Sequence, residues 1–223
     1  MRVGLFIPCY VDQLAPRVGL AALELLERYG VEVDFPTAQS CCGQPLWTAG
    51  ADAEARRLAA RFARVFDGYD HVVAPSGSCV ATARRLVPEP LAGRTHELCD
   101  FLTGVLGVDA PPGRFPHRVG IHTSCHARAA PVRTLLGALE GVELLEPARP
   151  DECCGFGGAF AVGEAAVSCL MGRDRLREHR ANGAEVITST DVSCLLHLAG
   201  LARRAGEPLR FLHVAELLWE ATS

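Results

Sequence analysis

The chain carries one pattern of cysteines twice. The tripeptide Cys-Cys-Gly occurs at 41–43 and again at 153–155, and each copy lies between two further cysteines at similar distances. The two sets are Cys9, Cys41, Cys42 and Cys79, followed by Cys125, Cys153, Cys154 and Cys194. Four thiols contributed by distant segments are typical of a metal or iron–sulfur site. The pattern therefore predicts a fold that brings such segments together twice.

Sequence similarity between the two halves extends beyond the cysteines. Residues 2–9 align without a gap to 118–125, and we align 71–74 with 185–188. Further along, 96–102 resembles 213–218. These similarities indicate an internal duplication of one unit rather than a long array of repeats.

Each half alternates short apolar strands with amphipathic helices. In the first half we expect strands at 2–7, 31–35 and 71–74, and helices at 15–29, 51–66 and from 79 to 86. In the second half we expect strands at 118–122, 142–145 and 185–188, and helices near 131–140, 161–179 and 192–204. This order predicts an α/β fold with two pseudo-symmetric, Rossmann-like parallel-sheet domains. The Pro-rich stretch 110–116 is the expected link, which gives domains of 1–113 and 114–223.

The patterned cysteines all follow predicted strands. In each half the first cysteine comes after the first strand, the doublet after the second and the last cysteine after the third. The carboxyl ends of the strands form the edge where open α/β sheets bind ligands. We therefore expect the four thiols of each half to meet at that edge.

Four converging thiols suit an iron–sulfur cluster, and Gly43 and Gly155 would let the backbone turn tightly or approach its inorganic core. A tetrahedral zinc site is the alternative for one or both halves, although paired C-x₂₋₄-C knuckles are missing from the sequence. Simple burial and a vicinal disulfide switch are two further interpretations. Cys99 and Cys169 lie outside the pattern and are expected in the core.

Composition excludes several other classes of protein. The net charge is -4 and the sequence has no basic run, which argues against nucleic-acid binding. No apolar run approaches the roughly 20 residues of a transmembrane helix, so we expect a cytoplasmic protein and not an integral membrane protein. Cytoplasmic thiols are kept reduced, which favours metal binding over disulfides. No G-x-G-x-x-G follows the first strand of either half, so the sequence shows no fingerprint of flavin or nicotinamide binding.

The motif C-x(n)-CCG-x(n)-C, used twice, resembles the cysteine-rich CCG domain. That domain occurs in the B subunit of heterodisulfide reductase, in the iron–sulfur subunits of glycolate and anaerobic glycerol-3-phosphate dehydrogenases, and in lactate utilisation protein A. A chain of two such domains looks most like the last family. The stretches that carry the resemblance are 31–36, 41–45, 75–79 and 153–158.

The resemblance implies a role in oxidising L-lactate to pyruvate as a non-autonomous subunit of an oxidoreductase. Its implied partners are a ferredoxin-like iron–sulfur subunit and a third lactate-utilisation subunit. By the same resemblance, the first four patterned cysteines would ligate one cluster and the second four another. A [4Fe-4S] cluster in each domain is the expected cofactor.

One departure from the fuller family motif concerns its C-x-x-C ending, which supplies a fifth thiol. Here Ser76 and Asp191 stand at the first position of that pair, so each site keeps four thiols. Four thiols favour an ordinary four-thiolate cluster over a five-thiolate non-cubane one. Asp191 would supply either an oxygen ligand or the N-cap of the next helix.

Several charged or titratable residues lie near the cysteines, and the sequence assigns none of them a catalytic role. His122, His126 and His197 would help couple proton to electron transfer, or would simply hydrogen-bond nearby groups. Arg17 and Arg128 would balance thiolate charge or meet a carboxylate substrate. Two other functions therefore stay open: a zinc-binding or metal-free thiol-redox protein, and a subunit that binds the carboxylate itself.

Overall fold

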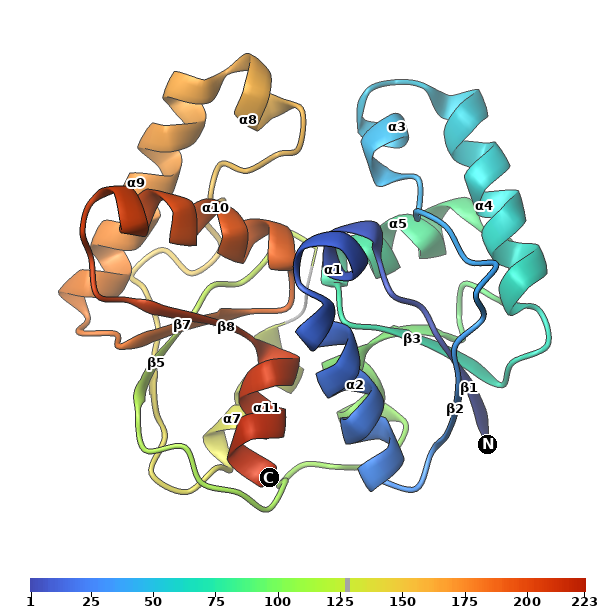
Figure 1. Ribbon diagram of the computed structural model, residues 1–223, viewed down its shortest axis with the longest axis horizontal. Helices are drawn as coiled ribbons and strands as arrows, with labels where there is room; N and C mark the ends of the chain where they lie inside the picture. The colour runs from blue at the N-terminus through green and yellow to red at the C-terminus, as the bar shows by residue number, and fades with distance from the viewer. Residues whose placement is uncertain (127–128) are drawn as a thin grey trace. The chain divides into compact units, whose positions relative to one another are not determined.

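A computed structural model describes residues 1–126 and 129–223. The chain divides into two compact units, Met1–Gly107 and Val108–Ser223, which run from blue to green and from green to red in Figure 1. Each unit has a four-stranded sheet, with strand order β2-β1-β3-β4 in the first and β6-β5-β7-β8 in the second. All strand pairs in both sheets are parallel. The predicted α/β class, with two similar parallel-sheet domains, is confirmed.

The first unit follows the expected alternation and adds short elements around it. Its elements are β1 (Arg2–Leu5), α1 (Cys9–Leu14), α2 (Pro16–Arg28), β2 (Glu32–Asp34), α3 (Gln44–Thr48), α4 (Asp52–Phe66), β3 (His71–Ala74), α5 (Gly77–Leu86), β4 (Thr95–Glu97) and α6 (Leu98–Gly104). Because β2, β1 and β3 are adjacent and parallel, the loops that carry the cysteines begin at the same carboxyl edge of the sheet.

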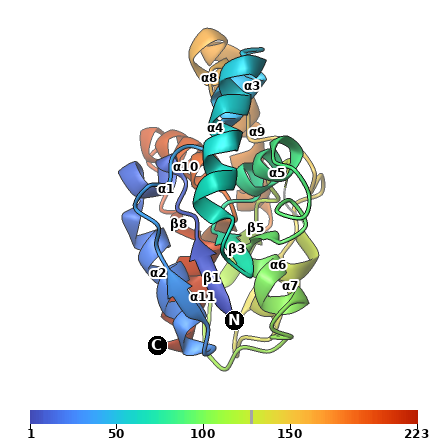
Figure 2. The same cartoon turned by 90° about the vertical axis from the view of Figure 1, so that its right-hand side faces the viewer.

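The second unit repeats this order within its described residues. Its elements are β5 (Arg118–Ile121), α7 (Ala129–Gly137), β6 (Glu143–Leu145), α8 (Phe160–Gly163), α9 (Ala165–Ala181), β7 (Val186–Ser189), α10 (Val192–Arg204), β8 (Arg210–His213) and α11 (Val214–Thr222). The single helix expected at 161–179 is thus two helices, because the backbone at Glu164 leaves the helical region (φ -119°, ψ 45°). In Figures 1 and 2, α3 and α8 each lie beyond the strands of their own unit, beside one end of α4 and α9.

The backbone pairing corrects our alignment of the two halves by one residue. Val3 pairs with His71 in the first sheet, and its equivalent Val119 pairs with Val186 in the second. His71 therefore corresponds to Val186 and not to Glu185. The same shift applies to the last strand of each sheet, where Ala74 pairs with Glu97 and Ser189 with His213. With this register, the distance from the third strand to its cysteine is the same in both units.

Amphipathic helices supply much of the core of each unit. On α2, Val18, Ala22, Leu25 and Leu26 are buried at the helical spacing that the sequence predicts. Near the first sheet, the rings of Phe6, Phe62 and Phe66 pack against one another with centroid distances of 4.6–5.8 Å. Among the described residues, no helix is both long enough and apolar enough to cross a membrane.

The stretch expected as a link contributes to the second unit. The Arg114 N–H donates a hydrogen bond to the carbonyl oxygen of Ala221, and the Phe115 N–H donates to that of Glu140. The Phe115 side chain is buried. Residues 113–116 are therefore fixed to the second unit, whose boundary lies at Val108.

A histidine pair in the first unit predicts a pH-dependent stability. His96 Nε2 lies 3.1 Å from His71 Nδ1, and burial, followed by the positive charges of His71 and Arg84, lowers the pKa of His96 to about 4. Between its ordinary pKa of 6.5 and about 4, the unfolded chain binds more protons at this residue than the folded chain does. The free energy of unfolding should therefore fall as the pH falls through this window.

Urea unfolding across that pH range, comparing the wild type with His96→Gln, checks this expectation. Because glutamine does not titrate, the variant should lose less stability on acidification than the wild type. An equal loss in both proteins would contradict a contribution from His96.

Candidate metal centres

The patterned cysteines lie on loops and helix starts at the carboxyl edge of each sheet. In the first unit Cys9 begins α1 after β1, the doublet follows β2, and Cys79 lies in the first turn of α5 after β3. Because β2 and β3 flank β1 on opposite sides, the chain changes direction between β1 and β3. Such a switch point is where open α/β sheets bind their ligands.

In the first unit, short contacts bring the four thiols together. The Sγ atoms of Cys9 and Cys41 are 3.8 Å apart, and Cys42 lies within hydrogen-bonding reach of Cys41 and Cys79. Cys42 and Cys79 are buried, whereas Cys9 and Cys41 are half-buried. The site thus has an enclosed side and a side nearer to solvent.

The four sulfurs do not hold their protons equally. Hydrogen bonds from Cys42 and then Cys9 lower the pKa of the Cys41 thiol far below its ordinary value. The same bonds, together with burial, raise the pKa of Cys9 and of Cys42. Cys41 is therefore the sulfur of this set that gives up its proton most readily, and thiolates are the form that binds metals.

The second unit has the same arrangement of thiols. Cys125 and Cys154 lie within hydrogen-bonding reach of Cys153, and Cys154 also reaches Cys194. Hydrogen bonds from Cys125 and then Cys154 lower the pKa of Cys153, as in the first unit. Cys154 is buried and Cys125 is exposed. Each set of four predicted residues is thus brought to one place.

A histidine joins the second set of thiols. One ring nitrogen of His122 and the Sγ atoms of Cys154 and Cys194 all lie within 4.8 Å of one another. His122 is only 2% exposed. Burial, followed by the positive charges of His179 and Arg175, lowers the pKa of His122 to about 3, so the imidazole is neutral and can offer a lone pair. Soft sulfur donors beside a neutral imidazole suit iron or zinc.

Comparisons with known sequences identify the family of this chain. The cysteine-rich domain family named CCG matches residues 3–84 and 119–199. Lactate utilization protein A of Geobacillus thermodenitrificans is 38% identical over 236 residues, covering 98% of both chains. The protein of the same name from Halalkalibacterium halodurans is 37% identical, covering 98% of this chain and 96% of its own. The chain belongs to the lactate utilization protein A family. It carries two CCG domains.

A solved structure shares the fold of these CCG domains. A hypothetical protein from Helicobacter pylori superposes on the whole of this chain, and on 49% of its own length, with a TM-score of 0.69. Its sequence identity is 11%, so the likeness concerns the fold alone.

The glycine of each CCG motif supports the sulfur before it. The Gly43 N–H donates to Cys41 Sγ over 3.4 Å, and the Gly155 N–H donates to Cys153 Sγ over 3.3 Å. Both glycines have positive φ angles, of 91° and 86°. Hydrogen bonds to sulfur are one of the means by which proteins tune a cluster. These hydrogen bonds are consistent with the predicted role of the two glycines beside a cofactor, which stays a prediction.

Gly155 also packs so closely that alanine should disrupt the second CCG domain. A Cβ atom there would lie 2.7 Å from Met171 Cβ and from the Ser168 carbonyl oxygen, in a backbone conformation that disfavours side chains. We expect Gly155→Ala to lower the free energy of unfolding by about 3 kcal/mol. Metal should also be lost from the second centre.

Gly158→Ala is the matched control for that substitution. Gly158 also has a positive φ, of 62°, but among the described residues no atom lies within 4 Å of its would-be Cβ. The control should cost about 1 kcal/mol and keep its metal. Urea unfolding and metal analysis distinguish the two variants, and equal effects would contradict the packing role of Gly155.

The residues at the position of the missing fifth thiol lie at helix starts. Ser76 is the N-cap of α5, where its side chain accepts a hydrogen bond of 3.3 Å from the Cys79 N–H. Asp191 is the N-cap residue of α10 and is buried. Ser76 therefore orients the turn that carries Cys79, the last cysteine of the first CCG domain.

The other singled-out residues differ in their placement. His126 and Arg17 are exposed, and Arg128 lies outside the described residues. The Nε2 atom of His197 lies 3.3 Å from the Ser168 carbonyl oxygen.

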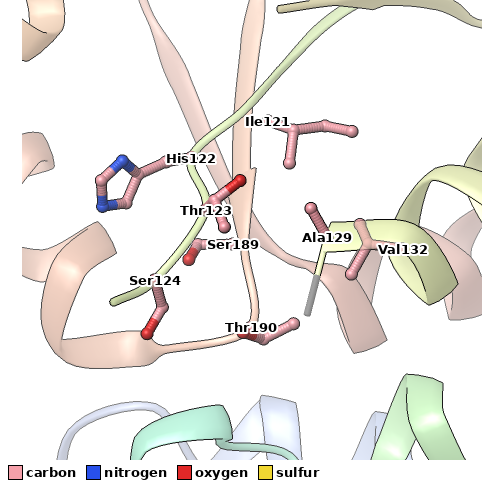
Figure 3. A pocket seen from close by; sticks show the side chains of 8 residues that line it. All are labelled: Ile121, His122, Thr123, Ser124, Ala129, Val132, Ser189 and Thr190. Atoms are coloured by element: carbon pink, nitrogen blue, oxygen red, sulfur yellow. The ribbon is translucent and has the colours of Figure 1, made fainter. Parts of the chain in front are cut away.

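A small cavity lies near the ends of β5 and β7. Its volume is about 10 Å³, room for one water molecule, and it is lined by Ile121, His122, Thr123, Ser124, Ala129, Val132, Ser189 and Thr190. In Figure 3 the His122 ring turns away from Ala129 and Val132.

Proposed function

We propose that this chain is the iron–sulfur electron-transfer subunit of a complex that oxidises L-lactate to pyruvate. The observation that carries the proposal is the convergence, in each CCG domain, of four thiols from three strand ends. The full-length similarity to proteins named lactate utilization protein A supports the choice of pathway. A bound cluster would supply one-electron storage and transfer.

In this proposal the residues of the chain hold, insulate and tune two centres. Cys9, Cys41, Cys42 and Cys79 would hold the first, and Cys125, Cys153, Cys154 and Cys194 the second, with a [4Fe-4S] cluster expected in each. The buried Cys42 and Cys154 lie on the enclosed side of each site, and the backbone N–H groups of Gly43 and Gly155 point at neighbouring sulfurs.

Lactate oxidation to pyruvate releases two electrons and two protons, whereas an iron–sulfur cluster accepts one electron at a time. Two centres in one chain would hold both electrons between donor and acceptor. We propose that a ferredoxin-like iron–sulfur subunit and a third subunit complete the cytoplasmic complex, and that the isolated chain does not turn over lactate.

Metal analysis of the anaerobically purified chain tests the proposal. We expect iron and acid-labile sulfide, together with a visible charge-transfer absorbance that dithionite bleaches. Zinc without iron would contradict the electron-transfer role and favour the zinc-binding alternative. Mixing the loaded chain with its partner subunits and lactate should reduce its clusters, and lactate without partners should not.

A further inference from the structure

We propose that His122 is a nitrogen ligand of the second centre, so that the two centres of this chain differ in their ligand sets. The first would be held by thiolates alone and the second by thiolates and one imidazole. This inference rests on the proposed function, and it concerns a residue that the cysteine motif does not contain.

Backbone pairing establishes which residue takes the place of His122 in the first unit. The His122 N–H donates to the Thr188 carbonyl oxygen over 2.8 Å, and the Phe6 N–H donates to that of Val73 over 2.9 Å. Since Val73 and Thr188 correspond in the sheet register, Phe6 and His122 occupy equivalent positions. A phenylalanine cannot ligate a metal, so the two sites differ at this point.

His122 is placed as a ligand should be. One of its ring nitrogens lies within 4.8 Å of two cysteine sulfurs on different loops. These three atoms are close enough for modest side-chain movement to bring all of them onto one metal centre. Within the described part of the chain, His122 Nδ1 is buried without a hydrogen-bond partner. An unpaired buried nitrogen is costly unless something binds it.

The residues behind His122 are also polar where the first unit has aromatic ones. The ring of Phe66 covers Gly4 in the first unit, and the ring of His179 covers the equivalent Gly120 in the second. Four residues earlier on the same helices stand Phe62 and Arg175.

An aromatic cluster in the first unit is thus replaced by a buried polar one in the second. The His122 and His179 rings lie 6.4 Å apart, and Arg175 is 1% exposed. Burying three polar side chains where phenylalanine suffices elsewhere is expensive. Metal-ligating histidines commonly have polar groups behind them, so the replacement is in keeping with a metal centre at His122.

The ligand difference has a consequence for electron transfer. A neutral imidazole brings no negative charge to a centre, whereas a thiolate at the same position would, and histidine ligation in place of cysteine raises the reduction potential of Rieske centres. The second centre of the wild type should therefore have a higher reduction potential than that of the His122→Cys variant.

Pulsed EPR of the reduced, anaerobically purified protein tests this assignment. To isolate the second centre, the experiment uses a Cys41→Ser, Cys42→Ser background. Protein labelled with ¹⁵N-histidine should show a nitrogen coupling of the strength of a directly bonded ligand. His122→Phe, which installs the residue of the first unit, should abolish this coupling, and exposed His126→Ala should keep it.

A second variant covers the case in which His122→Phe does not fold. His122→Cys supplies a sulfur ligand, so it should retain iron, lose the nitrogen coupling and shift the midpoint of the second centre to lower potential. An iron-loaded wild type with only weak, hydrogen-bond-type nitrogen coupling would overturn the inference and leave the proposed function intact. A wild type without iron would instead overturn the proposed function.

Discussion

Replacing Cys154 with serine is expected to remove the second centre and to halve the iron and sulfide content of the chain. Cys154 is 1% exposed and reaches both Cys153 and Cys194, so its sulfur is at the middle of the set. A serine hydroxyl is a poor ligand for soft metal ions. Cys42→Ser should remove the first centre for the same reason, and the double variant should contain no iron. Iron and sulfide assays, with EPR of the reduced protein, measure each loss.

Cys99→Ala is the matched control for burial. Cys99 is as buried as Cys42 but lies in α6, outside the thiol sets. The control should lower the stability of the first unit through lost packing and still keep both centres. Full iron content in Cys154→Ser, or a loss of iron in Cys99→Ala, would contradict the assignment of the eight ligands.

Much of the fold could be predicted because apolar periodicity is strong in the longer elements. The buried face of α2 and the strands β1 and β3 follow their sequence patterns. β4 and β8 carry polar residues such as His96 and Arg210. Because of this, they gave no clear strand signal, and our alignment there was shifted by one residue. Pairing partners define the register of such short strands, and a single sequence does not contain that information.

The two centres could be predicted from the duplication because strand ends of a parallel sheet share one edge. His122 is near Cys125 in the sequence, but His126 is nearer, so proximity in sequence favours His126. The usable signal was the alignment itself, which sets His122 against the apolar Phe6. The burial of His122 and its closeness to Cys154 and Cys194 are visible only in the folded chain. The burial of Arg175 could not be predicted from the sequence either, because charged residues on a helix of this composition usually face solvent.

Replacing Arg175 with methionine is expected to lower the free energy of unfolding by about 3 kcal/mol. The Arg175 guanidinium is buried, pairs with Glu178 and donates to the carbonyl oxygens of Arg149 and Glu152. These carbonyls belong to the loop that enters the second Cys-Cys-Gly motif. Methionine fills similar volume but leaves the carbonyl oxygens without this donor. The loop should loosen, and the second centre should lose iron more readily than the first.

Arg177→Met separates this effect from the loss of any arginine on α9. Arg177 lies two positions further along the helix, pairs with Asp174 and has a side chain that is 75% exposed. An exposed pair of this kind contributes within about 0.5 kcal/mol, so the control should unfold at nearly the wild-type urea concentration and keep both centres. Similar shifts in the two variants would mean that Arg175 acts only through the charge of the helix. A large shift in Arg175→Met alone, with selective loss of iron from the second centre, would tie the buried guanidinium to the loop that carries Cys153 and Cys154.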